Sequence, residues 1–235
     1  MKIYILPLLG AFLYGMCDNK ALKLVNSYKA IKECKDNYII LHNGKKFLYD
    51  DGKKKSFQER LNNPDIEDML KFIYPKGWVR PANKDYDPGR IRFEPLFKAL
   101  YGGSADEVRK NLVYIKWIDG SNILVTKKEG VSEALKKIVK ELKALPPNYS
   151  SYLKPIGGTF KWRKIAGTNR LSFHSFGTAI DINVKHANYW RWGGEYKNSI
   201  PKKIVEIFEK HGFIWGGKWY HFDTMHFEYR PELLK

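Results

Sequence analysis

Two short segments in the last third of the chain carry residue types that could do chemistry. The first contains His174 and Asp181, and the second contains Asp223 and His226. Two histidines and a carboxylate are ligand types of a catalytic zinc site, which keeps a fourth position open for water. Asp223, three residues before His226, would be a spare carboxylate able to act as a base. If the segments meet in space, the sequence predicts a metal-dependent hydrolase with one zinc ion per chain.

The residues around Asp181 predict a strand over residues 177–184. Side chains alternate across a strand, so Ile182 and Val184 would point to the core and Asp181 and Asn183 away from it. Burying a carboxylate beside such a row of apolar side chains costs free energy unless a cation or a hydrogen-bond donor pairs with it. We therefore expect Asp181 to face a cation or a cluster of donors.

The second segment predicts a strand that begins near His226. Alternation sends Phe227 to the core and turns His226 and Glu228 toward a cleft. Asp223 has the wrong parity to share that face on a regular strand. We expect it on the preceding loop, with a break in the strand near residues 224–225.

The remaining histidines leave an alternative open. A single histidine is often structural, and four of the six lie outside the pair formed by His174 and His226. His221 could itself pair with His226 in a metal site. We expect His186 at a strand end and His211 at a helix end.

The composition indicates a folded, strongly basic protein. Apolar residues make up 43% of the 235 residues and aromatic residues 15%, which excludes a disordered chain. The formal net charge of +17 implies attraction to polyanions such as nucleic acid, anionic membrane surfaces or anionic cell-wall polymers. No nucleic-acid motif accompanies the charge, and sequence readout needs placed base contacts. We expect no specific nucleic-acid binding.

The N-terminus predicts export. Lys2 precedes a short apolar run over residues 3–16 that is too short to span a bilayer, and polar sequence follows. This pattern is typical of a secretory signal, here residues 1–17, and places the protein in the periplasm or cell envelope. Cys17 stands where a lipoprotein cysteine would stand, so a lipid anchor is left open. Cys17 and Cys34 are not expected to form a disulfide framework.

The patterns along the chain predict the α+β class, with a small antiparallel sheet and flanking helices. Turn signals at Asn43-Gly44 and Asp119-Gly120 predict two hairpins. Ser104 and Ser132 are expected to cap helices, and a last helix is expected from about Pro201. The stretch over residues 75–97 is expected to be irregular. We divide the chain into a helix/hairpin extension (residues 18–75) and a domain that carries the candidate zinc site (residues 76–235).

The motifs around the four opening residues resemble a known family. They are Ser172-x-His174-x-x-Gly177-x-Ala179-x-Asp181 and Asp223-x-x-His226. They resemble the zinc D-alanyl-D-alanine carboxypeptidase family of metallopeptidases, which cleave D-Ala-D-Ala or L-Ala-D-Glu bonds of bacterial cell-wall peptides. The likeness is close over residues 157–231 and looser over residues 61–68 and 93–101. It implies the Hedgehog/DD-peptidase-like zinc peptidase fold, peptidoglycan stem peptides as substrates and a monomer.

The resemblance also implies roles for individual residues. His174, Asp181 and His226 would hold zinc, and Asp223 would be the general base. Many members have glutamate at that position and the endopeptidase-like branch has aspartate, so Asp223 leans toward endopeptidases and leaves the scissile bond open.

The family has a further arginine before the first histidine that stabilises the developing oxyanion. Arg163 matches its place best and Arg170 is the second choice. An arginine suits this task because it is a permanently charged donor fork. Ser172 would orient His174 or donate to the substrate.

Two other interpretations compete with a zinc peptidase. Ser151-Tyr-Leu-Lys154 matches the Ser-x-x-Lys motif of serine acyl-enzymes, but Pro155 disfavours helical geometry at Lys154 and no Lys-Thr-Gly motif is present. A non-catalytic, zinc-stabilised cell-wall or partner-binding module is the second. The spare carboxylate of Asp223 argues against it, because a purely structural site needs no base.

Overall fold

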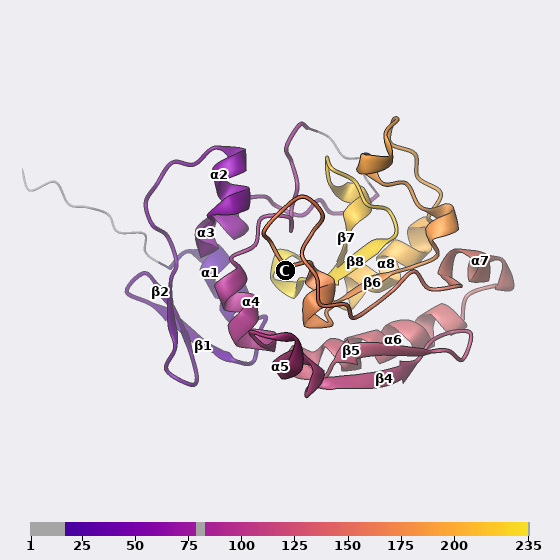
Figure 1. Ribbon diagram of the computed structural model, residues 1–235, viewed down its shortest axis with the longest axis horizontal. Coiled ribbons are helices and arrows are strands. Elements are labelled where there is room, and N and C mark those ends of the chain that lie inside the picture. Colours follow the sequence, from indigo (N-terminus) through magenta and orange to yellow (C-terminus); the bar gives the residue numbers. More distant parts are fainter. Residues whose placement is uncertain (1–16, 79–82, 235) are drawn as a thin grey trace, which may run out of the picture.

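The computed structural model describes residues 17–78 and 83–234. Helices and strands of the described residues follow one another without a regular β-α-β alternation, and the strands form three small antiparallel sheets (Figure 1). The predicted α+β class is confirmed, with three small sheets instead of one. The proposed signal, apart from its last residue, lies outside the described residues. Within those ranges, no helix has the length and hydrophobicity needed to cross a membrane.

The first elements are a short helix and a three-stranded sheet. Its last two strands form the hairpin predicted at Asn43-Gly44, and Gly44 has the positive φ of +83° that this turn requires. The elements are α1 (Asn19–Val25), β1 (Ile31–Lys35), β2 (Tyr38–Leu41) and β3 (Lys46–Leu48).

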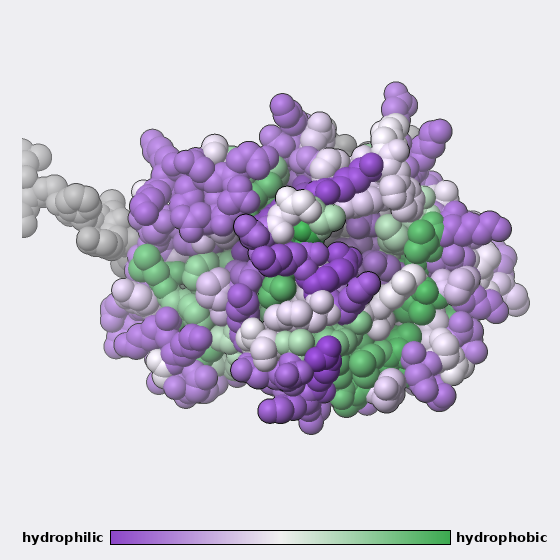
Figure 2. Space-filling view, in the orientation of Figure 1, coloured by the Kyte–Doolittle hydropathy of each residue, from purple (hydrophilic) through white to green (hydrophobic). Residues whose placement is uncertain are grey.

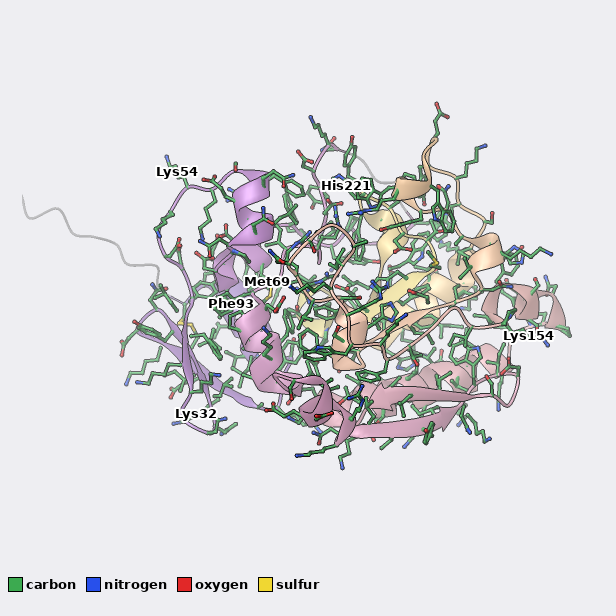
Figure 3. The ribbon with its side chains drawn as sticks, viewed as in Figure 1. Lys32, Lys54, Met69, Phe93, Lys154 and His221 are labelled. Carbon is green, nitrogen blue, oxygen red and sulfur yellow. A yellow bond between two sulfur atoms is a disulfide. The ribbon has the colours of Figure 1, made fainter. Side chains whose placement is uncertain are left out.

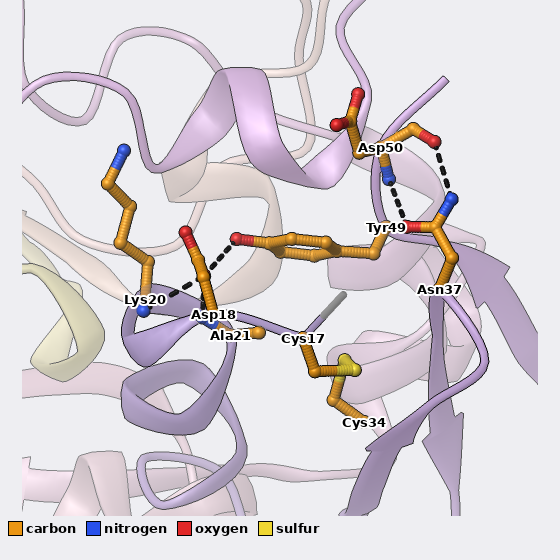
Figure 4. The surroundings of a disulfide bond; sticks show 8 residues. All are labelled: Cys17, Asp18, Lys20, Ala21, Cys34, Asn37, Tyr49 and Asp50. Carbon is orange, nitrogen blue, oxygen red and sulfur yellow. Dashed lines mark hydrogen bonds between the residues drawn. A yellow bond between two sulfur atoms is a disulfide. The ribbon is translucent and has the colours of Figure 1, made fainter. Parts of the chain in front are cut away.

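A disulfide joins Cys17 to Cys34 and ties the start of α1 to β1 (Figure 4). Beside it, Asp18 caps α1 and also accepts a hydrogen bond from the Tyr49 hydroxyl at 2.6 Å. The prediction that the two cysteines stay unpaired is wrong, because the turn into β1 brings distant residues together. A sulfur bonded to Cys34 cannot carry a lipid thioether. The structure therefore contradicts a lipid anchor at Cys17, and a cleaved signal would have to end before it.

Four short helices follow. Ser56 and Asp65 start the first two with capping boxes, and Ser104 caps the fourth as predicted. The helices are α2 (Phe57–Asn62), α3 (Ile66–Met69), α4 (Glu94–Tyr101) and α5 (Ala105–Arg109). The sequence analysis missed α2, and the irregular stretch ends at Glu94 instead of residue 97.

A second hairpin and the longest helix of the described residues come next. They are β4 (Leu112–Lys116), β5 (Asn122–Thr126), α6 (Val131–Lys143) and the short α7 (Ser150–Leu153). The hairpin at Asp119-Gly120 is confirmed. The cap of α6 is Gly130, with φ +80°, and Ser132 lies buried in the first turn, so the predicted cap is wrong. Lys154 has extended backbone after α7, as Pro155 led us to expect.

The third sheet has the order β6-β8-β7 and packs against α8. Its elements are β6 (Ala179–Asp181), β7 (Phe213–Trp215), β8 (His226–Tyr229) and α8 (Lys202–Lys210). Phe227 of β8 stacks on Phe208 of α8 with ring centroids 4.0 Å apart. Burying such a side chain contributes about 2–3 kcal/mol. This packing fixes which face of β8 turns away from the core.

The strand at Asp181 is shorter than predicted. It ends at Asp181; Val184 is exposed, and Asn183 donates hydrogen bonds to the carbonyls of Ser151 and Lys154. The predicted core position of Val184 and site-facing position of Asn183 are therefore wrong. Alternation holds only as far as Ile182, which is buried.

Most of the buried hydrophobic residues in the described part of the chain belong to one large cluster, and a second, small cluster contains Tyr74, Ile214 and Trp219. The large cluster includes Leu24 of α1, Leu96 of α4, Ile138 of α6 and Phe208 of α8. Residues from both the proposed extension (residues 18–75) and the proposed domain (residues 76–235) thus belong to this cluster. The division of the chain at residue 76 stays a prediction. Hydrophilic side chains cover most of the face shown in Figure 2, with hydrophobic residues gathered over the region of β4 and β5.

Candidate metal centre

Three ligand-type side chains converge at the paired ends of β6 and β8. The register of the two strands places Asp181 opposite His226. His174 comes from a 3-10 turn (Phe173–Phe176) that Gly177 reverses with φ +68°. His174 Nε2 lies 3.2 Å from Asp181 Oδ2 and 3.2 Å from His226 Nδ1, and His226 Nδ1 lies 2.9 Å from Asp181 Oδ1. The structure therefore brings together the three predicted ligands, all within 4.8 Å of one another.

The outward-facing nitrogen of each histidine is held by an acceptor. His174 Nδ1 lies 2.6 Å from the carbonyl oxygen of Thr159, and His226 Nε2 lies 3.1 Å from Glu228 Oε2. A carbonyl or carboxylate oxygen only accepts hydrogen bonds, so each of these ring nitrogens must carry the proton. In the neutral imidazoles, the lone pairs of His174 Nε2 and His226 Nδ1 then point into the cluster.

This arrangement fits a metal ion. Two imidazole lone pairs and the Asp181 carboxylate would otherwise meet as three acceptors at close range, an arrangement that needs a cation or a proton between them. Nitrogen and carboxylate ligands suit zinc, and ligating histidines usually donate their other N–H to a carboxylate or carbonyl. His174 and His226 have those partners in Thr159 and Glu228.

The electrostatics of the cluster reflect the same crowding. Burial alone would raise the pKa of Asp181, but the imidazoles of His174 and His226 outweigh it and hold this pKa well below its usual range. Burial disfavours the charged form of His226, yet hydrogen bonds to Asp181 and Glu228 raise its pKa to about 10. The cluster therefore favours positive charge at its centre.

Asp223 lies on the loop before β8, as predicted, and a turn at residues 224–225 separates it from the strand. It lines the same cleft as the three ligand-type residues. Its Oδ1 is buried and has no hydrogen-bond partner within the described part of the chain. Burial raises the pKa of Asp223 to about 7. A carboxylate with this pKa can accept and release a proton near neutral pH.

The absence of a side chain at Gly216 allows the loop that carries Asp223 to pack closely against the backbone of Gly216. A Cβ at Gly216 would lie 2.5 Å from the carbonyl oxygen of Asp223, closer than any real side chain comes. The amide of Asp223 donates to the carbonyl of Gly216 at 3.0 Å. The pair fixes Asp223 beside the cluster.

The other predicted site residues separate into two groups. Arg163 and Ser172 line the cleft at the metal cluster, whose volume is about 100 Å³. Arg170 does not line it and contacts a neighbouring cavity. The partner of His174 Nδ1 is the carbonyl of Thr159. This backbone carbonyl therefore orients the ring of His174, which was one of the two roles predicted for Ser172. The roles of Arg163, Arg170 and Ser172 stay predictions.

His221 does not join His226 in the cluster. Its Nδ1 lies 2.6 Å from Asp87 Oδ2, and its backbone N–H donates to Asp87 Oδ1 at 2.9 Å. The ring of His221 also packs edge-on against Trp190 at 4.6 Å. The alternative pair of His221 and His226 is therefore excluded, although His221 lines the cleft.

Sequence reasoning missed several residues that line the cleft. Arg90 and Arg92 come from the irregular stretch before α4, and Tyr189, Trp190 and Arg191 come from the long segment between β6 and α8. The dense run Asp87-Pro-Gly-Arg-Ile-Arg92 was the available signal, because charged residues beside Pro and Gly are frequent in functional loops.

Together the fold and the cluster define a class: an α+β protein with a His–Asp–His cluster beside a partly buried carboxylate, which are the residue types of metal-dependent hydrolases. Residues 166–229 match the family model described as D-alanyl-D-alanine carboxypeptidase, and this confirms the family resemblance. The matched segment contains His174, Asp181, Asp223 and His226, while Arg163 lies just before it. No curated protein and no solved structure matches the chain significantly.

Proposed function

We propose that the protein is a zinc-dependent peptidase of the bacterial cell wall. It would hydrolyse D-Ala-D-Ala or another bond of peptidoglycan stem peptides, with the Hedgehog/DD-peptidase-like fold and as a monomer. The proposal rests on the convergence of His174 Nε2, Asp181 and His226 Nδ1 beside Asp223, whose buried Oδ1 has no hydrogen-bond partner among the described residues. The family match supports the peptidase activity and the wall substrate.

The residues divide the chemistry among them. His174, Asp181 and His226 would hold the zinc ion, which supplies Lewis acidity to a water molecule and to the scissile carbonyl when bound. Asp223 accepts the proton of the attacking water and returns it to the leaving amine. Arg163, which lines the cleft, would stabilise the developing oxyanion with its permanent positive charge.

Export to the cell envelope is part of the proposal. The disulfide between Cys17 and Cys34 supports it, because disulfides persist in oxidising compartments. The substrate, a wall polymer, lies in the same place. The basic surface suits an anionic envelope.

A non-catalytic zinc-stabilised module is the second candidate. Asp223 argues against it, since a carboxylate oxygen buried without a hydrogen-bond partner among the described residues costs stability and a structural site gains nothing from it. Mass spectrometry of purified peptidoglycan, digested with the protein in the presence and absence of a chelator, separates the two. Chelator-sensitive release of D-alanine or cleaved stem peptide supports the peptidase, and an unchanged digest supports the module.

A further inference from the structure

A second, larger cavity opens beside the metal cluster. Its volume is about 1060 Å³, and five residues line both it and the smaller cleft. These shared residues are Arg90, Arg92, Trp190, Arg191 and His221. A ligand could therefore extend from one hollow into the other. Phe93 and His221, two of the residues lining the larger cavity, are labelled in Figure 3.

The wall of this cavity carries an excess of positive charge. We call the group formed by Arg90, Arg92, Arg170 and Arg191 the arginine annex. The carboxylate in the lining is Glu94, which pairs with Lys98 at 2.7 Å and accepts a hydrogen bond from the Leu171 amide. It is thus already engaged outside the annex.

Two of the four arginines are neutralised and two are not. Arg90 pairs with Asp87 at 2.7 Å, and Arg92 pairs with Glu228. Within residues 17–78 and 83–234, no salt bridge joins Arg170 or Arg191 to a carboxylate. The annex therefore presents two uncompensated guanidinium groups beside the candidate metal centre.

Arg170 shows most clearly that a partner is missing. Among the described residues, its Nε is buried without a hydrogen-bond partner, and its Nη1 donates a hydrogen bond to the Arg90 carbonyl at 3.4 Å. Burial and the neighbouring charges of Arg92, Arg90 and Arg191 lower its pKa to about 10. A buried donor without an acceptor is costly, and an anion in the cavity would relieve both the repulsion and the missing hydrogen bonds.

The rest of the lining suits a peptide. Gln58, Asn62 and Asn63 on and after α2 offer amide groups, while Phe57 and Trp190 offer apolar faces. The ring of Phe57 stacks on His221 with centroids 6.1 Å apart, so the N-terminal extension forms one wall of the cavity. The planar guanidinium group of an arginine can donate two parallel hydrogen bonds to one carboxylate group.

We propose that the arginine annex binds free carboxylates of the peptide substrate, away from the scissile bond. The preferred substrate class is then an acidic peptide with at least two free carboxylates, and Arg170 and Arg191 select for them. This inference rests on the proposed function, because it assumes that a peptide occupies the adjoining cleft.

Binding of a fluorescent peptide tests the proposal. The zinc-loaded Asp223→Asn protein is titrated with a stem-type peptide carrying three free carboxylates and with the same peptide fully amidated. We expect at least tenfold tighter binding of the free acid, and about a tenfold loss in Arg170→Gln or Arg191→Gln for the free acid alone. Arg109→Gln, which removes an exposed arginine outside the cavity lining, should bind like the parent.

Three outcomes would overturn the proposal that the arginine annex binds free carboxylates. They are equal affinity for the two peptides, equal losses for both peptides in the arginine variants, and Arg170-dependent binding of inorganic polyphosphate without binding of the acidic peptide. Matching thermal unfolding of the variants and the parent verifies folding, and Arg170→Lys should retain part of the preference. Because binding is measured without turnover, its outcome is independent of the peptidoglycan digest.

Discussion

Glu228 accepts a hydrogen bond from Nε2 of His226 at 3.1 Å and is itself fully buried. Arg92 and Arg230 both pair with it, and these charges keep its pKa at about 2 although burial alone would raise it. The proton of His226 is therefore held on Nε2, and Nδ1 is left for a ligand. The prediction that Glu228 faces the cleft is therefore wrong: Glu228 is buried behind His226 and supports the candidate metal centre from there.

Replacing Glu228 with glutamine should weaken zinc binding. Partners of this kind change metal affinity 10–100-fold, so we expect a loss of roughly that size in competition with a chromophoric chelator. The change also leaves Arg92 without its charged partner and removes one of the two carboxylates that pair with Arg230, and it should cost about 3–5 kcal/mol of stability. Glu206→Gln, on the exposed side of α8, is the matched control. Parent-like zinc affinity in Glu228→Gln would refute the support role.

His174→Ala should abolish stoichiometric zinc binding, because it removes one of three converging ligands. The measurement is metal content after dialysis against trace zinc. His42→Ala removes an exposed histidine and should retain one zinc per chain. A His174→Ala protein that still holds one zinc would rule out His174 as a ligand.

Gly216→Ala should displace Asp223. The new Cβ would meet the Asp223 carbonyl oxygen at 2.5 Å, so the loop must shift, at a cost of about 1–3 kcal/mol. We expect zinc to stay bound while turnover falls at least tenfold. Gly158→Ala, where a Cβ meets nothing within 4 Å, is the control. Full turnover in Gly216→Ala would show that the close approach has no part in catalysis.

The disulfide should stabilise the chain by constraining its unfolded state. For a separation of 17 residues, loop-closure entropy gives about 3 kcal/mol. The double variant Cys17→Ser/Cys34→Ser should lose that much free energy of unfolding in denaturant titrations. Wild-type protein in reductant should behave like the variant. Identical stability of the oxidised and reduced forms would contradict the bond.

The residues of the metal cluster could be predicted because local rules place them. Strand alternation puts Asp181 and His226 on the face opposite Phe227, and the turn before β8 follows from the wrong parity of Asp223. Both hairpins followed from turn residues that accept positive φ. These features depend on a few neighbouring residues.

What could not be predicted depends on contacts between distant segments. The carbonyl of Thr159 reaches His174 from an irregular segment, and Asp87 reaches His221 across 134 residues. The periodicity of apolar residues in the sequence does not predict contacts between such distant segments. The pairing of Cys17 with Cys34 likewise depends on distance in space, which the sequence spacing does not reveal.

We propose that Asp223 moves the proton at a zinc site built by His174, Asp181 and His226. Bound zinc and turnover of purified peptidoglycan, measured on one preparation of Asp223→Asn, test this role. We expect about one zinc per chain, as in the wild type, with turnover reduced on the order of 10²–10⁴-fold. Wild-type turnover in this variant would contradict it, as would wild-type activity from protein stripped of zinc.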